Sequence, residues 1–125
     1  MKKLGFGLMR LPKINGEIDI EQVKSMADAF LSNGFTYFDT AYVYENSEVA
    51  FKEAVVKRYN RSDYYIADKL TAWKLKEGFD KEEIFKESLD RLGIEYIDYY
   101  LLHAVQEANI EIYNDFFFFY KFIDK

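Results

Sequence analysis

An α/β fold with parallel strands is the class that the 125-residue sequence predicts. Short runs rich in apolar, aromatic and β-branched residues alternate with segments whose apolar residues recur at helical spacing. Three of the runs end at Asp39, Lys69 and His103, which lie 30 and 34 residues apart, the size of one strand and one helix with their loops. A single proline, Pro12, and the absence of a linker-like stretch predict one domain over residues 1–125.

The first part of the chain predicts two strands with a helix between them. Residues 4–11 (LGFGLMRL) form an apolar run that predicts the first strand, and a loop follows it. Asp19, with Gln22 three positions later, resembles a capping box and predicts the start of a helix, which Gly34 ends. Residues 35–40 (FTYFDT) then predict the second strand.

The same order is repeated along the rest of the chain. Residues 47–59 carry apolar side chains on one helical face, and residues 64–70 (YYIADKL) predict a third strand. A third helix is expected to begin at Asp80, where an acidic residue three positions later completes the cap, and to end at Gly93. Residues 96–103 (YIDYYLLH) predict the fourth strand.

Composition excludes several classes of protein. The chain has no cysteine, so disulfides, a thiolate nucleophile and cysteine-ligated zinc or iron–sulfur clusters are excluded. The net charge is −5 and the basic residues are scattered, which argues against a nucleic-acid partner. Apolar stretches fall well short of the ~20 residues of a membrane span, and the start of the chain lacks a secretory cleavage pattern. We therefore expect a cytoplasmic protein with no membrane partner and no metal.

Periodicity alone leaves open whether the strands form an open, doubly wound sheet or part of a closed barrel. Both folds build their active sites at the carboxyl ends of parallel strands. Asp39, Lys69 and His103 each stand at such an end. We therefore expect these three side chains to lie near one another.

Together with Tyr44, these residues suit the protonation of a carbonyl oxygen. A phenol has an ordinary pKa of about 10, so it acts as a general acid near neutrality only where a cation stabilises its phenolate. Lys69 can be that cation, and Asp39 on the neighbouring strand can keep the lysine charged. His103 can orient the carbonyl oxygen by a hydrogen bond. Such a group suits a reaction in which hydride arrives at the carbonyl carbon, and this implies a reduced nicotinamide cofactor.

Four stretches of the sequence resemble the N-terminal half of the aldo-keto reductase family. They are GFGLMRLP near the start, GFTYFDTAYVYENSE, IADKL and ESLDRLGIEYIDYYLLH, in the family's order and at close to its spacings. The resemblance implies a (β/α)8 barrel of the TIM type, of which this chain holds the first four βα units as a half-barrel. It also implies the reduction of small aldehydes or ketones to alcohols, with NADPH or NADH as the hydride donor.

The resemblance implies a catalytic tetrad in this sequence. Tyr44 is the implied proton donor, and Lys69 and Asp39 are the pair that lowers its pKa. His103 is the implied substrate-orienting residue. The implied contacts near the nicotinamide are Leu8, Met9, Arg10 and Asp39, whereas most of the cofactor site is implied to lie in the other half of the barrel.

A second interpretation follows from the length of the chain. A complete barrel of this type needs about 200 residues or more, so the 125 residues predict an incomplete domain. The product would then be a non-catalytic, truncated half-barrel or a self-associating interaction module. Its first and fourth strands would lack outer neighbours, so we expect a homodimer through these open edges. The aromatic run at residues 116–122 (FFFFYKF), read as a helix, would add exposed apolar surface.

Each feature also has a plainer interpretation when it is taken alone. His103 could be a structural residue, Lys69 an ordinary surface lysine, and Asp39 a residue that caps a turn. The basic stretch at residues 57–61 (KRYNR) is expected to be a solvated helix end. Asp68 stands where the family commonly has a small hydroxylic residue, and it is expected to point away from Lys69 because side chains alternate along a strand.

Overall fold

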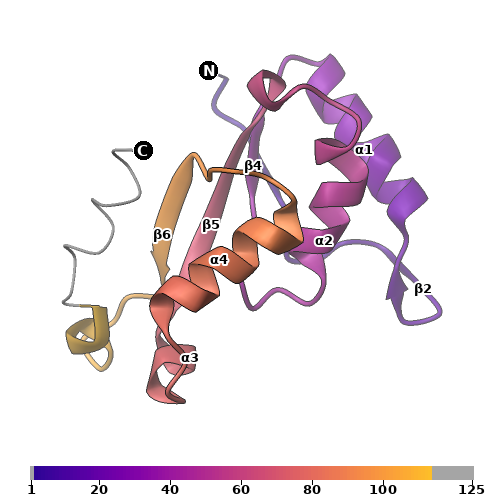
Figure 1. Cartoon of the computed structure of the whole chain (residues 1–125). Helices are drawn as coiled ribbons and strands as arrows, with labels where there is room; N and C mark the ends of the chain where they lie inside the picture. Colours follow the sequence, from indigo (N-terminus) through magenta and orange to yellow (C-terminus); the bar gives the residue numbers. More distant parts are fainter. Residues whose placement is uncertain (1, 114–125) are drawn as a thin grey trace.

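Four parallel strands form the main sheet of the protein (Figure 1). The computed structural model describes residues 2–113. The strands lie in the order β1-β4-β5-β6, and each pairs in parallel with its neighbour. Their bounds are Gly5–Gly7 for β1, Tyr37–Asp39 for β4, Tyr65–Thr71 for β5 and Tyr99–His103 for β6.

Helices connect the successive strands of this sheet. The α-helices are α1 (Ile20–Ser32), α2 (Ser47–Phe51), α3 (Ala72–Lys76) and α4 (Lys81–Leu92). A π-helical turn, η1 (Lys52–Val56), continues α2, and two short 3-10 helices are η2 (Arg61–Asp63) and η3 (Ile110–Tyr113). Figure 1 shows α1, α2 and α4 on one side of the sheet.

Within residues 2–113 the main sheet is wound in one direction. A doubly wound sheet reverses its strand order at a switch point and carries helices on both faces. Here each new strand is added on the same side of the previous one, and the helices α1, α2 and α4 cover one face (Figure 1). The observed strand order therefore contains no switch point within residues 2–113.

The expected helix ends are confirmed. The Asp19 side chain accepts a hydrogen bond of 3.2 Å from the backbone N–H of Gln22, so it caps α1. Asp80 caps α4 by accepting two backbone N–H groups of its first turn, at 2.8 and 3.1 Å. Gly34 and Gly93 follow the two helices with φ of 78° and 69°, a conformation that favours glycine.

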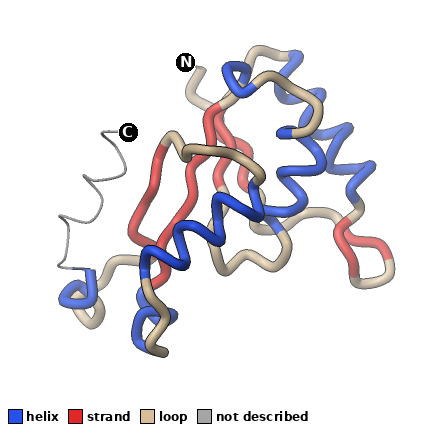
Figure 2. Tube along the Cα trace, in the orientation of Figure 1, coloured by secondary structure: helices blue, strands red, loops and turns tan. Residues whose placement is uncertain are grey.

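The first strand is shorter than expected and is followed by an unexpected hairpin. β1 covers only Gly5–Gly7, paired with Tyr37–Asp39 of β4, and after the Leu8 N–H bonds the Asp39 carbonyl the chain turns away at Met9 and Arg10. The stretch expected to be a loop contains β2 (Lys13–Ile14) and β3 (Glu17–Ile18), which pair antiparallel. Figure 2 shows this hairpin apart from the main sheet.

Two further helical segments differ from the expectation drawn from the sequence. The helix expected over residues 47–59 is built from α2 and η1 and ends at Val56. Directly after β5 the chain forms α3, a short helix that the sequence pattern does not predict. The aromatic run at residues 116–122 lies outside the described residues.

The main core lies between the sheet and the helices that cover it. Phe38 of β4 is at its centre, with no exposed surface and with ring centroids 5.5, 5.1 and 5.1 Å from those of Phe6, Phe30 and Phe51. Truncating a buried phenylalanine of this kind typically costs about 3–5 kcal/mol. A smaller cluster, which contains Leu70 and Ile84, packs α4 against the far part of β5.

The opposite face of the sheet is open within residues 2–113. Strand register and alternation place Tyr37, Tyr65, Tyr99 and Leu101 on this face, together with Lys69. Tyr65, Tyr99 and Leu101 expose 41, 44 and 40 % of their surface. The ring of Tyr99 lies 5.7 Å from that of Tyr37 and 6.4 Å from that of Tyr65. We call these four apolar residues (Tyr37, Tyr65, Tyr99 and Leu101) the open face.

Among the helices of residues 2–113, none combines the length and apolar character that crossing a membrane requires.

Candidate active site

Three strands bring polar side chains to one end of the sheet. Asp39 is the last residue of β4, and it pairs in register with Ala67 of β5. Lys69 lies two residues further along β5, so its side chain is on the same face as that of Asp39. His103 ends β6. The structure therefore brings together the strand-end residues that the sequence singles out.

Lys69 and Asp39 form an ion pair. The Lys69 Nζ donates a hydrogen bond of 2.6 Å to Asp39 Oδ1 and one of 2.7 Å to the backbone carbonyl of Thr40. The Lys69 side chain is 14 % exposed and that of Asp39 is 32 % exposed. An ammonium that is largely removed from water needs such a partner to stay charged. The pair thus holds the Lys69 ammonium in place at the end of the sheet.

Tyr44 lies in the loop that follows β4, and hydrogen bonds fix this loop. Its backbone N–H donates to the Ala41 carbonyl at 3.0 Å, and its carbonyl accepts from the Ser47 N–H at 3.1 Å. The Ser47 hydroxyl also donates to the Leu8 carbonyl at 2.9 Å, which ties the loop to the first strand region. The Lys69 Nζ lies 5.1 Å from the centroid of the Tyr44 ring. The loop therefore places the phenol beside the Lys69 ammonium.

Tyr42, two residues earlier, has a different environment. Its hydroxyl donates a hydrogen bond of 2.7 Å to Glu87 of α4, and its ring packs against the Arg91 guanidinium at 4.5 Å. Tyr42 is therefore a contact between the loop and α4, and it is a matched control for Tyr44. A hollow of about 280 Å³ lies beside this loop, and both tyrosines line it together with Arg91 of α4.

His103 lies between two aromatic rings. Its ring centroid is 5.7 Å from that of Tyr44, edge to face, and 5.3 Å from that of Trp73. Burial lowers the pKa of His103, the charge of Lys69 lowers it further, and the Asp39 carboxylate opposes this. The imidazole is therefore neutral near pH 7. Its Nδ1 is buried and has no hydrogen-bond partner within residues 2–113.

The three residues expected near a nicotinamide have different environments. The Leu8 side chain is 1 % exposed and belongs to the helix-side core. Met9 is 61 % exposed and Arg10 is exposed, in the turn that follows. The Leu8 backbone donates to the Asp39 carbonyl at 2.9 Å and accepts from Ser47. Leu8 thus fixes this turn, and only Met9 and Arg10 present their side chains to solvent.

Two further groups at this end were not anticipated from the sequence. The Thr40 carbonyl is the second acceptor for Lys69, a backbone role that residue type does not indicate. Trp73 of α3 is the only tryptophan of the chain and is 42 % exposed beside His103. Its position four residues after Lys69, just past a strand end, is the signal that could have identified it.

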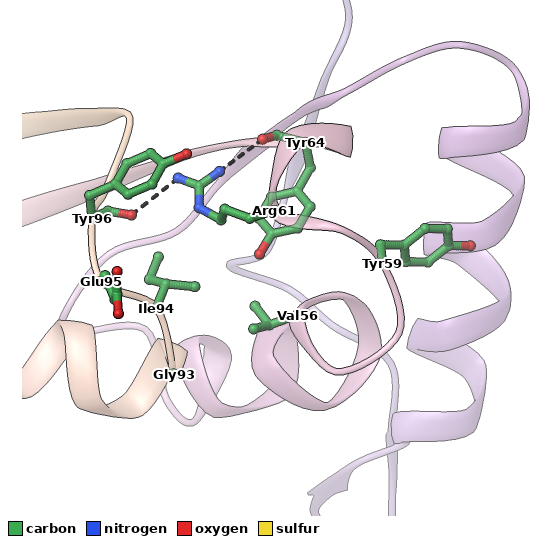
Figure 3. A pocket seen from close by; sticks show the side chains of 8 residues that line it. All are labelled: Val56, Tyr59, Arg61, Tyr64, Gly93, Ile94, Glu95 and Tyr96. Carbon is green, nitrogen blue, oxygen red and sulfur yellow. Dashed lines mark hydrogen bonds between the residues drawn. The ribbon is translucent and has the colours of Figure 1, made fainter.

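A second hollow lies at the other end of the strands (Figure 3). It has a volume of about 240 Å³ and is lined by Val56, Tyr59, Arg61, Tyr64, Gly93, Ile94, Glu95 and Tyr96. Figure 3 shows the Arg61 guanidinium bonded to two backbone carbonyls, Tyr64 at 3.0 Å and Tyr96 at 3.1 Å. It also pairs with Asp98 at 2.7 Å. The expectation that residues 57–61 are simply solvated is wrong for Arg61, because this side chain joins the segment before β5 to the segment before β6.

Within residues 2–113 there is no group of three or more His, Asp or Glu residues arranged to hold a metal ion. The candidate site is thus an organic group of one phenol, one ammonium, one carboxylate and one imidazole.

Comparison with known proteins gives one family. The model of the Aldo/keto reductase family matches residues 3–123. An aldo-keto reductase of Mycobacterium sp. (strain KMS) is 32 % identical over 110 residues, which are 86 % of this chain and 37 % of the relative. An NAD/NADP-dependent indole-3-acetaldehyde reductase of Schizosaccharomyces pombe is 39 % identical over 103 residues, 80 % of this chain and 34 % of the relative. The chain thus spans about a third of the length of the curated relatives it matches.

A solved structure agrees with these matches. The aldo-keto reductase MGS-M4, from a Medee basin deep-sea metagenome library, superposes with a TM-score of 0.67 at 31 % identity. The similarity covers 97 % of this chain and 42 % of the MGS-M4 chain.

Proposed function

The chain belongs to the aldo/keto reductase family, and from that premise we propose that it carries the proton-donating group for the NAD(P)H-dependent reduction of an aldehyde or ketone. The observation that supports this proposal is the meeting of Asp39, Tyr44, Lys69 and His103 at one end of the sheet. The S. pombe relative, by its name, reduces an aldehyde with NAD or NADP. The chain would supply the first four βα units of a (β/α)8 barrel.

The described residues fit the nicotinamide end of such a cofactor. Gly7 lies in register with Asp39, and a Cβ built on Gly7 meets no atom within 4 Å. There is thus open space beside the Asp39–Lys69 pair, and the exposed side chains of Met9 and Arg10 follow it. We assign Met9, Arg10 and Asp39 to this end of the cofactor, with Leu8 fixing the turn between them. When bound, the reduced nicotinamide supplies the hydride to the carbonyl carbon.

The residues of the chain would perform the proton chemistry. The Tyr44 hydroxyl donates its proton to the carbonyl oxygen as the C=O bond becomes a C–O–H group. The Lys69 ammonium stabilises the phenolate left on Tyr44, and Asp39 keeps Lys69 charged. The neutral imidazole of His103 donates a hydrogen bond to the substrate oxygen from Nε2, because its Nδ1 is buried. A proton from solvent then restores Tyr44.

This proposal is tested by comparing Tyr44→Phe with Tyr42→Phe in the same chain. NADPH binding is followed by the fluorescence of Trp73, and turnover is followed by NADPH oxidation with a set of small aldehydes. We expect Tyr44→Phe to lower turnover by about 10²–10⁴-fold, the range for loss of a general acid, and to leave NADPH binding unchanged. Tyr42→Phe should keep turnover, since its hydroxyl is bonded to Glu87. Equal turnover in Tyr44→Phe and the parent chain would contradict the role of Tyr44.

The open face favours a second candidate function. It exposes apolar side chains over the centre of the sheet, and the chain spans about a third of its relatives' length. The second candidate is a non-catalytic module that associates with another copy of the chain through the open face. Absence of both NADPH binding and turnover in the parent chain would favour this second candidate over the reductase.

A further inference from the structure

Two carboxyl groups are buried together on the helix-covered side of the sheet. Asp68 of β5 has no exposed surface, and Glu48 of α2 is 2 % exposed. Asp68 is next to Lys69 in sequence, but alternation along the strand directs it to the opposite face. The helices α2 and α4 cover this face (Figure 1). The pair thus lies directly behind the Lys69 end of the candidate site.

The hydrogen bonds of the two carboxyl groups differ. Glu48 Oε1 accepts from the Ser88 hydroxyl at 2.6 Å, and Glu48 Oε2 accepts from the Arg91 guanidinium at 3.1 Å. Asp68 Oδ1 accepts from the Lys69 backbone N–H at 2.7 Å. Asp68 Oδ2 is buried and receives no hydrogen bond from any residue within 2–113. One carboxyl oxygen out of four is therefore left without a donor.

A proton on Asp68 would turn its unpaired oxygen from an acceptor into a donor. Two carboxylates are both acceptors, so they can hydrogen-bond each other only when one of them is protonated. A buried carboxylate without a donor is costly, and the pair has one neighbouring guanidinium for two acids. Burial raises the pKa of Asp68 and the nearby Glu48 carboxylate raises it further, whereas the Lys69 backbone N–H and the Lys69 ammonium lower it. Asp68 is therefore the member of the pair that keeps a proton.

We propose that Asp68 is neutral in the folded protein, donates its Oδ2 proton to Glu48, and acts as a positioning residue that holds the backbone of Lys69. The shared proton would fix the Asp68 side chain, whose other oxygen binds the Lys69 N–H. The Lys69 side chain then projects from this fixed backbone toward Asp39 on the other face. The positioning part rests on the role proposed above for Lys69, whereas the shared proton does not.

The other ionisable groups around the pair keep one charge state near neutrality. Arg91 of α4 stays cationic, because its two acidic neighbours, Glu48 and Glu87, raise its pKa despite burial. Tyr42 and Tyr100 stay neutral, because burial raises the pKa of both phenols. The Lys69 ammonium lies on the opposite face, bound to Asp39. The protonation state of Asp68 therefore decides whether the proposal is correct.

The direct test is a carbon-13 NMR titration of the aspartate carboxyl groups in the parent chain. The proposal expects the Asp68 signal to stay at its protonated position well above about pH 4, the ordinary range for an aspartate in water. In Glu48→Gln, which removes the acceptor's charge, the Asp68 midpoint should shift to lower pH. An Asp68 signal that titrates near pH 4 in the parent chain would overturn the shared proton. This measurement needs neither cofactor nor turnover.

The positioning role is tested with Asp68→Asn and Asp68→Ala. Asparagine resembles the protonated acid, because it keeps the acceptor for the Lys69 N–H and presents N–H donors to Glu48. The reporter is the single histidine, His103, whose pKa is lowered by the nearby Lys69 charge. We expect Asp68→Ala to raise the NMR midpoint of His103 and to speed hydrogen exchange of the Lys69 amide at least tenfold. Asp68→Asn should leave both unchanged.

Controls separate positioning from general destabilisation. Asp90→Asn makes the same chemical change at an exposed position of α4 and should alter neither reporter. If Asp68→Asn changed the reporters as much as Asp68→Ala does, the positioning role would be overturned. If Asp68→Ala does not fold, the comparison of Asp68→Asn with the parent chain still decides the matter, because any shift of the His103 midpoint in Asp68→Asn contradicts the proposal. Failure of NADPH binding would affect only the function proposed above.

Discussion

At the scale of single residues, His103 gives the most direct check of the candidate site. It is the only histidine of the chain, so its ring proton signal in an NMR titration needs no assignment. Burial and the Lys69 charge lower its pKa from the ordinary value of 6.5. We expect a midpoint below 6.5 in the folded chain. A midpoint at or above that value would contradict the burial of His103 beside Lys69.

The same group makes stability depend on pH with a defined sign. Because the folded state binds the proton less readily than the unfolded state, the unfolded chain holds more protons between the two pKa values. The contribution of His103 to the free energy of unfolding is thus present above pH 6.5 and is lost as the pH falls through the lowered value. Asp39→Asn should lower the midpoint further, since the Asp39 carboxylate is the neighbour that raises it.

Residue types predicted the four members of the candidate tetrad, and the structure brings them together. The offset from Asp39 to Tyr44 was the useful signal, because it distinguishes Tyr44 from the ten other tyrosines. For Asp68, the sequence predicted only the face of the sheet on which its side chain lies. Alternation places it opposite Lys69, but its complete burial beside Glu48 depends on α2 and α4, which come from distant parts of the sequence.

At the scale of elements, α4 depends on its N-terminal cap. Asp80 accepts two backbone N–H groups that would otherwise have no partner in the helix. We expect Asp80→Ala to lower the free energy of unfolding by about 1 kcal/mol, measured by urea denaturation. Asp80→Asn should cost much less, because asparagine caps nearly as well. An unchanged midpoint in Asp80→Ala would mean that α4 is held by its buried face alone.

Elements with strong local signals were predicted well, and short ones were not. The helices that begin after Asp19 and Asp80 have an apolar face and a cap, so their ends are near those expected. The β2–β3 hairpin was missed, although Asn15–Gly16 is a typical two-residue turn and both residues have positive φ. Its strands have two residues each, too few for a period-two pattern to be recognised. The same shortness hides α3.

At the scale of the whole molecule, the open face predicts self-association. Tyr65 exposes 41 % of its surface at the start of β5, within a layer of aromatic rings. We expect the 14.9 kDa chain to sediment above its monomer mass at high concentration, and Tyr65→Glu to shift it toward monomer. Ile14→Glu changes an apolar residue on the hairpin, away from the sheet, that is 59 % exposed and so more exposed than Tyr65; it should leave the mass distribution unchanged. A compact monomer at every concentration would contradict this prediction.

The sequence by itself determined the alternation of strands and helices, the helix caps and the residues of the candidate tetrad. These follow from local periodicity, from side chains that bond their own helix, and from motifs of a few residues. Only the tertiary structure decided which face of the sheet is covered, that Lys69 binds both Asp39 and the Thr40 carbonyl, and that Asp68 is buried beside Glu48. The physical reason is that burial and charge pairing arise where distant segments pack together, and no local pattern records that contact.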